Sequence, residues 1–237
     1  MRLLNSLSIL SLNTLLPMHL TSSLKLSLES FLKTCSMLLL LVSSSFIQPT
    51  FGDTDFSTTQ SIQYQDQHLV IIGSIDTVFV QRIKAAYQIA PRSQPITTFE
   101  ITSTGGDVEA AIDLGEFIFK HQLSVYIPEL CLSSCANYLF TAGKEKIITP
   151  NTVLGWHGGA LQKSLSKNPI LNKESLKKLR VKEKEFFQLI KVDQMICTLG
   201  QEALYNIQQF WTYNLIDLEK MGVNNIKLMD TILNNDI

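Results

Sequence analysis

The sequence predicts an α/β fold with a helical C-terminal region, and three observations support this class. Beyond residue 60, short runs rich in β-branched residues alternate with segments whose apolar residues follow helical spacing. Such alternation is the signature of βαβ units built around parallel strands. Beyond Lys173 the spacing becomes helical. Hydrophobic residues make up 45% of the 237 positions, which is ample for one core.

The first strands and helices are predicted between residues 68 and 122. "HLVIIGSI" is a short β-rich run interrupted by Gly73, so it is predicted to be a strand. "DTVFVQRIKAAYQIA" has helical spacing, with Asp76 as its expected N-cap and Pro91 after its end. "ITTFEITS" is predicted to be the next strand, "TGGD" a tight turn, and "VEAAIDLGEFIFKHQ" the next helix.

The alternation continues as far as His157. "SVYIP" is a predicted strand, the segment after Ser133 is predicted to be helical to Gly143, and "KIITP" and "TVLGWH" are strand-like. Three predicted helices follow: "KESLKKLRVKEKEFFQLIKVDQMICTL", "QEALYNIQQF" and "IDLEKMG". Most charges of the first are assigned to a solvated face. Residues 60–237 are expected to form one domain.

The N-terminal segment, residues 1–52, has a different composition. "KTCSMLLLLVSSSFI" places a basic residue before a short apolar run, and "PTFGDTD" then turns small and polar. This layout predicts a signal peptide, because the run falls short of the roughly 20 apolar residues of a membrane span. An uncleaved N-terminal membrane anchor is the alternative. The domain is therefore expected to be periplasmic or secreted, or else anchored to the inner membrane with the domain outside the cytoplasm.

Export changes what the cysteines predict. Cys35 leaves with the leader, and Cys131 and Cys135 lie four positions apart, close enough to form a disulfide if the local turn permits it. Cys197 is then the odd thiol and is expected to be buried in a helix. No Cys/His cluster has zinc spacing, so no metal and no cofactor is expected. A formal net charge of −1, without a basic stripe, argues against nucleic-acid binding.

Three polar features fall where predicted strands end, which is where α/β proteins place active sites. They are the Gly105–Gly106 turn, the Ser133–Ser134 turn at the start of a helix, and His157. Glycines let the backbone approach a ligand, and a helix start leaves N–H groups free for an oxyanion. Each feature alone has a structural explanation: a plain turn, a helix cap or a packed histidine. Their combination favours an active site.

Three segments, "STGGDVEAAIDLGEFI", "CLSSCANYLFTAG" and "TPNTVLGWH", resemble the Clp protease proteolytic subunit of the ClpP/crotonase superfamily. The resemblance covers roughly residues 66 to 228 and is closer still to an exported branch of Clp-like bacterial proteins. It implies a ClpP/crotonase-like spiral of βαβ units. In the family the nucleophile precedes the last glycine of the second motif by nine residues, and the catalytic histidine follows the Asn of the third by six. These positions are Ser134 and His157 in this chain.

The resemblance also assigns roles to the neighbouring residues. Ser134 is the expected nucleophile and His157 its general base. The backbone N–H groups of Gly106 and Cys135 are the expected oxyanion donors. A disulfide between Cys131 and Cys135 would clamp the turn that carries the nucleophile.

The family's third catalytic residue, an aspartate, would fall near Phe210–Trp211 in this chain, and neither residue can orient a histidine as a carboxylate does. The nearest polar substitutes in sequence are Asn214, Asp217 and Asp193. We therefore predict that no carboxylate lies within hydrogen-bond reach of the His157 ring.

The function expected from these features is that of an exported serine peptidase-like hydrolase that cleaves peptide or other acyl bonds. A catalytically weak or inactive binding or assembly module is the main alternative. A crotonase-type acyl-CoA enzyme is less favoured, because an exported protein rarely meets acyl-CoA. The expected partners are a peptide or protein substrate and further copies of the chain. Contact with a membrane is expected only if the leader is uncleaved.

Overall fold

The computed structural model of the protein describes residues 59–162, 165, 172–201 and 210–229, which belong to one compact unit. The predictions for residues 1–52, and most of the helix predicted at "QEALYNIQQF", lie outside these residues. Within the described ranges, no helix combines the length and the apolar character needed to cross a membrane.

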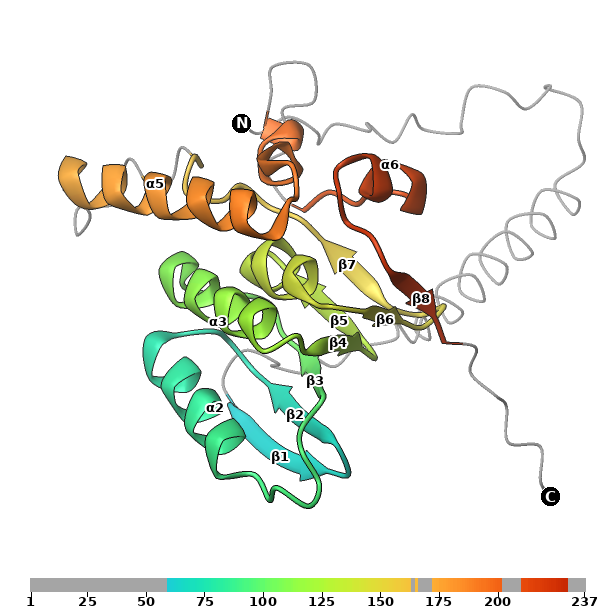
Figure 1. Ribbon diagram of the computed structural model, residues 1–237. Helices are drawn as coiled ribbons and strands as arrows, with labels where there is room; N and C mark the ends of the chain where they lie inside the picture. The colour runs from blue at the N-terminus through green and yellow to red at the C-terminus, as the bar shows by residue number, and fades with distance from the viewer. Residues whose placement is uncertain (1–58, 163–164, 166–171, 202–209, 230–237) are drawn as a thin grey trace, which may run out of the picture. The chain divides into compact units, whose positions relative to one another are not determined.

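A six-stranded sheet, with strand order β1-β2-β3-β4-β6-β8, forms the centre of the fold (Figure 1). Its strands are β1 (Ser61–Gln65), β2 (His68–Ile72), β3 (Thr98–Thr102), β4 (Ser124–Ile127), β6 (Lys146–Ile148) and β8 (Ile226–Leu228). Only β1 and β2 pair antiparallel, and every other neighbouring pair is parallel. The predicted α/β class with a mostly parallel sheet is therefore confirmed.

A second, two-stranded sheet positions the candidate site. It pairs β5 (Leu130–Leu132) in parallel with β7 (Val153–Gly155), and Leu132 lies opposite Gly155. An isolated bridge from Ser103 to Cys131 joins this small sheet to the end of β3. Because the two strands are parallel, the serine turn that follows β5 and the histidine that follows β7 lie at the same end of this sheet.

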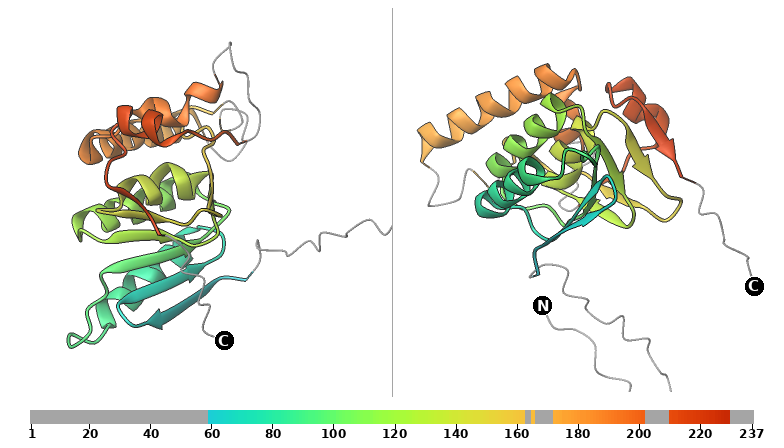
Figure 2. Two further views of the ribbon diagram at one scale, coloured as in Figure 1. Left: turned by 90° about the vertical axis from the view of Figure 1, so that its right-hand side faces the viewer. Right: turned by 60° about the horizontal axis from the view of Figure 1, so that its bottom comes forward.

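The helices α2, α3 and the π-helix η2 lie on one face of the large sheet, and α5 lies beyond α3 (Figures 1 and 2). The helices are α2 (Thr77–Ile89), α3 (Val108–Lys120), η2 (Cys135–Phe140), α5 (Lys173–Ile190), η3 (Gln194–Cys197), η4 (Leu199–Gln201) and α6 (Leu215–Lys220). Asp76 caps α2 as predicted, because its carboxylate accepts a hydrogen bond from the N–H of Phe79 at 2.8 Å.

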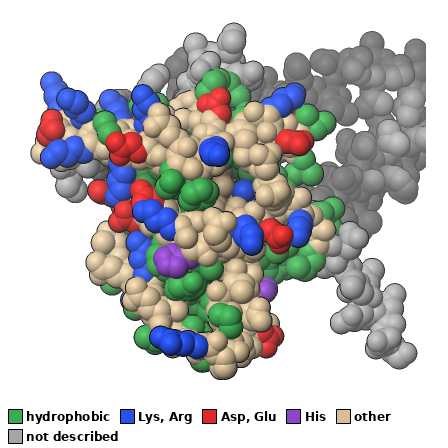
Figure 3. Space-filling view, in the orientation of Figure 1, with side chains coloured by type: hydrophobic (Ala, Val, Ile, Leu, Met, Phe, Trp, Pro, Cys, Tyr) green, Lys and Arg blue, Asp and Glu red, His purple; other side chains and the backbone are tan. Residues whose placement is uncertain are grey.

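Helix α5 is amphipathic, with an apolar face toward the core and a charged face toward solvent. Its buried residues recur at helical spacing and include Phe186 and Phe187, which pack toward η2 through Tyr138. Basic and acidic side chains mix on the outer surface along α5 (Figure 3). Lys182 there pairs with Asp113 at 2.6 Å. The predicted solvated face is thus present, with one exception, the fully buried Glu183, which is described with the site below.

The long helix predicted from Lys173 ends earlier than expected. Lys191 adopts a left-handed conformation with φ 59°, and its N–H still bonds the carbonyl of Phe187. Asp193 then caps the short 3₁₀-helix η3, because its side chain accepts from the N–H of Met195. A residue in the left-handed region commonly ends a helix. The helix therefore stops at Ile190, although the apolar spacing continues beyond it.

Candidate active site

The serine turn between β5 and η2 is held in an unusual backbone conformation. Ser133 has φ 52°, in the left-handed region that residues other than glycine seldom adopt. Its N–H donates to the carbonyl of Gly155 at 2.8 Å, and its own carbonyl accepts from the N–H of Asn137 at 2.8 Å. Such conformations persist where surrounding contacts fix them, and they cluster at functional sites.

The serine beside the imidazole is Ser133. Its Oγ lies 3.5 Å from Nδ1 of His157, whereas the Oγ of Ser134 donates to the carbonyl of Gly106 at 2.7 Å. The prediction that paired Ser134 with His157 is therefore corrected by one position. The cause is the backbone: Ser133 is left-handed, but Ser134 is right-handed at φ −56° and ψ −27°, so the two side chains leave in different directions.

The backbone of His157 is fixed by a side chain that the sequence did not single out. Asn137, 1% exposed, donates through Nδ2 to the carbonyl of His157 at 2.8 Å, and its Oδ1 accepts from the N–H of His157 at 3.4 Å. One residue of η2 thus bonds both the serine turn and the histidine. Its polar side chain within the apolar run "CANYLF" was the available signal.

The glycine turn has one polar group to spare. The N–H of Gly105 donates to Oγ of Ser103 at 3.1 Å, and the carbonyl of Gly105 accepts from the N–H of Ile75 at 2.9 Å. The carbonyl of Gly106 accepts from Ser134. Among the residues that the structure describes, the N–H of Gly106 has no acceptor. Because backbone groups are normally paired, this N–H is the candidate donor for a ligand.

Both positions of this turn require glycine. Gly105 has φ 92°, and a Cβ built there would lie 2.8 Å from Cβ of Ser133 and 2.9 Å from the N of Ser134. A Cβ on Gly106, at φ 154°, would lie within van der Waals exclusion of the Ile75 carbonyl oxygen. The glycines let this turn pack closely against the serine turn and Ile75, whereas an approach to a ligand stays a prediction.

Further N–H groups are free at the start of η2. Neither Ser134 nor Cys135 donates its N–H to an acceptor in the described part of the chain, as is usual in the first turn of a helix. Ser134 directly follows Ser133, so its N–H is a candidate anion donor beside the N–H groups of Gly106 and Cys135, the two predicted for this role.

The two cysteines that flank the serines lie at disulfide distance. Their Cα atoms are 5.2 Å apart and both side chains are buried, so the bond encloses Leu132, Ser133 and Ser134 in a short loop. Cys197 is free and buried in η3, as predicted. Burial, and to a lesser extent the nearby Glu183 carboxylate, raises the pKa of the Cys197 thiol well above its usual value, which makes it unreactive.

Glu183 is a fully buried carboxylate that sequence reasoning missed. Its Oε1 accepts from the hydroxyl of Tyr138 at 2.5 Å and from the N–H of Ala160 at 2.8 Å, and its Oε2 accepts from Gln194 at 2.6 Å. Burial first, and the neighbouring Glu183 among other groups, raise the pKa of Tyr138 well above its usual value. Ala160 lies three residues after His157, so Glu183 anchors the loop that follows the histidine to α5.

The position that the Clp resemblance gives to the third catalytic residue does lie beside the imidazole. The ring of Phe210 has its centroid 5.5 Å from that of His157. Asp193 caps η3, and Asp217 accepts from Asn214 at 2.8 Å in the cap of α6. Residues 202–209 lie outside the described residues, so the absence of a carboxylate from the ring remains a prediction.

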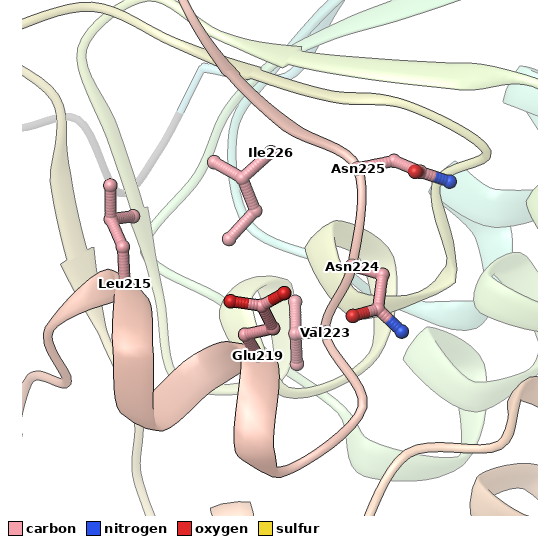
Figure 4. Close-up of a pocket in the computed structure, with 6 residues that line it drawn as sticks. All are labelled: Leu215, Glu219, Val223, Asn224, Asn225 and Ile226. Atoms are coloured by element: carbon pink, nitrogen blue, oxygen red, sulfur yellow. The ribbon is translucent and has the colours of Figure 1, made fainter.

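Two of the cavities among the described residues, both apart from this site, have distinct linings. One of about 460 Å³ is bounded by α6 and the start of β8, and its lining is Leu215, Glu219, Val223, Asn224, Asn225 and Ile226 (Figure 4). The other, about 270 Å³, contains Lys146, whose side chain is buried (6% exposed) and donates to the carbonyl of Gly143 at 2.7 Å. Burial lowers the pKa of Lys146 to about 8. Neither cavity is lined by Ser133 or His157.

The site therefore offers a hydroxyl beside an imidazole nitrogen and, next to that hydroxyl, backbone N–H groups with no acceptor in the described part of the chain. No cluster of His, Cys, Asp and Glu suited to a metal ion occurs in the described ranges. Searches of protein-family models and of curated proteins found no match to this chain.

Proposed function

We propose that the protein is a serine hydrolase of the peptidase type, with Ser133 as nucleophile and His157 as general base. The observation that carries the proposal is the 3.5 Å contact between Ser133 Oγ and His157 Nδ1, next to the uncommitted N–H of Gly106. The contact exceeds the hydrogen-bond range of about 2.6–3.2 Å, and catalytic hydrogen bonds often tighten only when substrate binds.

The chemistry follows the pattern of acyl transfer. Neutral His157 takes the proton of Ser133 on Nδ1 while Oγ attacks the acyl carbon, and the carbonyl oxygen becomes an anion. The N–H groups of Gly106 and Ser134 donate to that oxygen. His157 then returns the proton to the leaving group, and water, activated by the same imidazole, hydrolyses the acyl-enzyme. Each well-aimed oxyanion donor contributes roughly 3–4 kcal/mol of transition-state stabilisation.

The proposal includes the finer fold and setting that the Clp resemblance implies. Parallel βαβ units with helices on one face, and a small second sheet carrying the serine turn, support a ClpP/crotonase-like spiral. A disulfide between Cys131 and Cys135 supports an oxidising compartment, and hence export. Peptides or proteins are the proposed substrates, and self-association is the proposed assembly state; both derive from the resemblance.

Labelling of the full chain with a fluorophosphonate probe tests the proposal. The wild type and Ser134→Ala should label, Ser133→Ala should not, and peptide mapping should place the label on Ser133. His157→Ala should label far more slowly, because the hydroxyl loses its base. Labelling that survives Ser133→Ala would remove Ser133 from the mechanism. A folded wild type that does not label at all would favour the binding or assembly module.

A further inference from the structure

We infer that Ser134 is a positioning residue whose hydroxyl holds the glycine turn so that the N–H of Gly106 faces the oxyanion. The inference rests on the proposed function and assigns the second serine of the pair a role different from that of the first. Ser133 attacks the substrate, and Ser134 keeps the oxyanion donor in place.

The hydroxyl of Ser134 is committed to this task by its surroundings. The side chain is 2% exposed, and its Oγ donates to the carbonyl of Gly106 at 2.7 Å. Because the carbonyl can only accept, the proton of this hydroxyl is engaged by Gly106. A buried, donating hydroxyl is a poor candidate for a nucleophile and a good candidate for a structural support.

The glycine turn needs such support, since two consecutive glycines allow peptide units to rotate at little cost. On the Gly105–Gly106 peptide, the carbonyl accepts from Ile75, so the N–H of Gly106, trans to it, points away from Ile75. On the next peptide, the carbonyl of Gly106 accepts from Ser134, and the N–H of Asp107 donates to the carbonyl of Ile75 at 2.8 Å. The hydroxyl of Ser134 therefore holds the carbonyl end of the peptide that follows the oxyanion donor, and Ile75 holds its N–H end.

A second serine acts on the other side of the same donor. Oγ of Ser103, 2% exposed, accepts from the N–H of Gly105 at 3.1 Å. Two serine hydroxyls thus hold the groups on either side of the Gly106 N–H, which has no acceptor among the described residues. Loss of either hydroxyl should loosen the same donor.

Steady-state kinetics on the full chain test this role, with p-nitrophenyl butyrate as substrate and phenylboronic acid as a tetrahedral-anion inhibitor. Ser134→Ala should lower kcat by about tenfold to a hundredfold, less than the loss of a whole oxyanion donor, with KM within about twofold. The inhibition constant of the boronic acid should rise by a similar factor, because its bound anion uses the same N–H groups. Ser134→Thr, which keeps the hydroxyl, should retain most of kcat.

Matched variants separate the possible outcomes. Ser103→Ala should also lower kcat and raise the inhibition constant of the boronic acid, and it replaces Ser134→Ala if that variant fails to fold. Ser93→Ala, on an exposed loop, should match the wild type. Wild-type kcat and boronic-acid affinity in Ser134→Ala would overturn the positioning role and leave the Ser133 mechanism intact. Fluorophosphonate labelling that is lost in Ser134→Ala but kept in Ser133→Ala would overturn both.

Discussion

Ser133 Oγ and His157 Nδ1 lie 3.5 Å apart, although 24 positions separate the two residues in the chain. Their proximity follows from the parallel pairing of β5 with β7, in which Leu132 lies opposite Gly155. Both strands end at that pair, so the residues after them meet at one edge. Changes to the supports of the serine turn or of the histidine backbone should therefore affect reactivity while the large sheet stays intact.

Asn137→Ala should slow fluorophosphonate labelling by about tenfold to a hundredfold, because His157 loses both hydrogen bonds that fix its backbone. Loss of these two half-buried hydrogen bonds should also lower the free energy of unfolding by about 1–3 kcal/mol. Labelling rates and urea unfolding measure the two effects. Asn151→Ala, at an exposed turn, is the matched control. A labelling rate equal to that of the wild type would show that Asn137 does not position the histidine.

The double variant Cys131→Ala, Cys135→Ala should lower the free energy of unfolding by about 2 kcal/mol, the chain-entropy value for so short a loop. Its labelling should also slow, because the left-handed Ser133 loses the covalent closure of its turn. Mass spectrometry of non-reduced peptides from protein taken from its native compartment should find Cys131 linked to Cys135 and Cys197 free. Two free thiols at Cys131 and Cys135 would refute the disulfide.

Because Lys146 loses its proton more readily in the folded chain, the protein should be more stable at pH 10.5 than at pH 8. Burial lowers its pKa to about 8 from 10.5, so between these values the unfolded chain binds more protons than the folded chain. The free energy of unfolding should then rise as pH rises from about 8 to 10.5, by up to about 3 kcal/mol.

Lys146→Met tests this pH dependence, because it removes the titrating group while keeping the length of the side chain. The variant should lose most of the rise, measured by urea unfolding at pH 7, 9 and 10.5. Lys177→Met, exposed on α5, should retain the rise. If the free energy of unfolding rises equally with pH in Lys146→Met and in the wild type, groups other than Lys146 cause the rise.

Glu183→Gln should lower the free energy of unfolding by about 2 kcal/mol. The two carboxylate oxygens accept hydrogen bonds from three donors, whereas an amide has only one acceptor oxygen. The loop after His157 should loosen as the bond to Ala160 weakens, and labelling should slow. Glu185→Gln, exposed on the same helix, should change neither quantity. Unchanged thermal unfolding in Glu183→Gln would mean that the buried network adds little to stability.

The sequence supplied the main strands and helices because their apolar spacing is local. It did not supply β1, β5 or β8, which are short or lie at a sheet edge and depend on pairing with distant strands. Glu183 was missed for a related reason: its partners Ala160 and Tyr138 lie 23 and 45 positions away, so nothing nearby signals its burial.

Motif spacing assigned the nucleophile to Ser134, whereas the structure places Ser133 beside His157 and bonds Ser134 to Gly106. What separates Ser133 from Ser134 is the sign of one backbone angle, which the spacing of residues does not encode. Asn137 was overlooked because its role consists of hydrogen bonds to the backbone of His157, 20 positions away, and Ser103 because a bond to a turn only two residues on has no distinctive sequence pattern.

The helices of this fold give its two ends opposite electrostatic character. α3 and η2 begin beside the glycine and serine turns. The cavity that contains Lys146 is lined by residues at or near the ends of α3, η2, α5 and α6, namely Gln122, Thr141, Lys191 and Gly222. Peptide dipoles aligned along a helix place partial positive charge at its start and partial negative charge at its end. The field at the Ser133 end thus favours an anion forming there, while the buried ammonium of Lys146 sits at the opposite end, among helix termini that favour a cation.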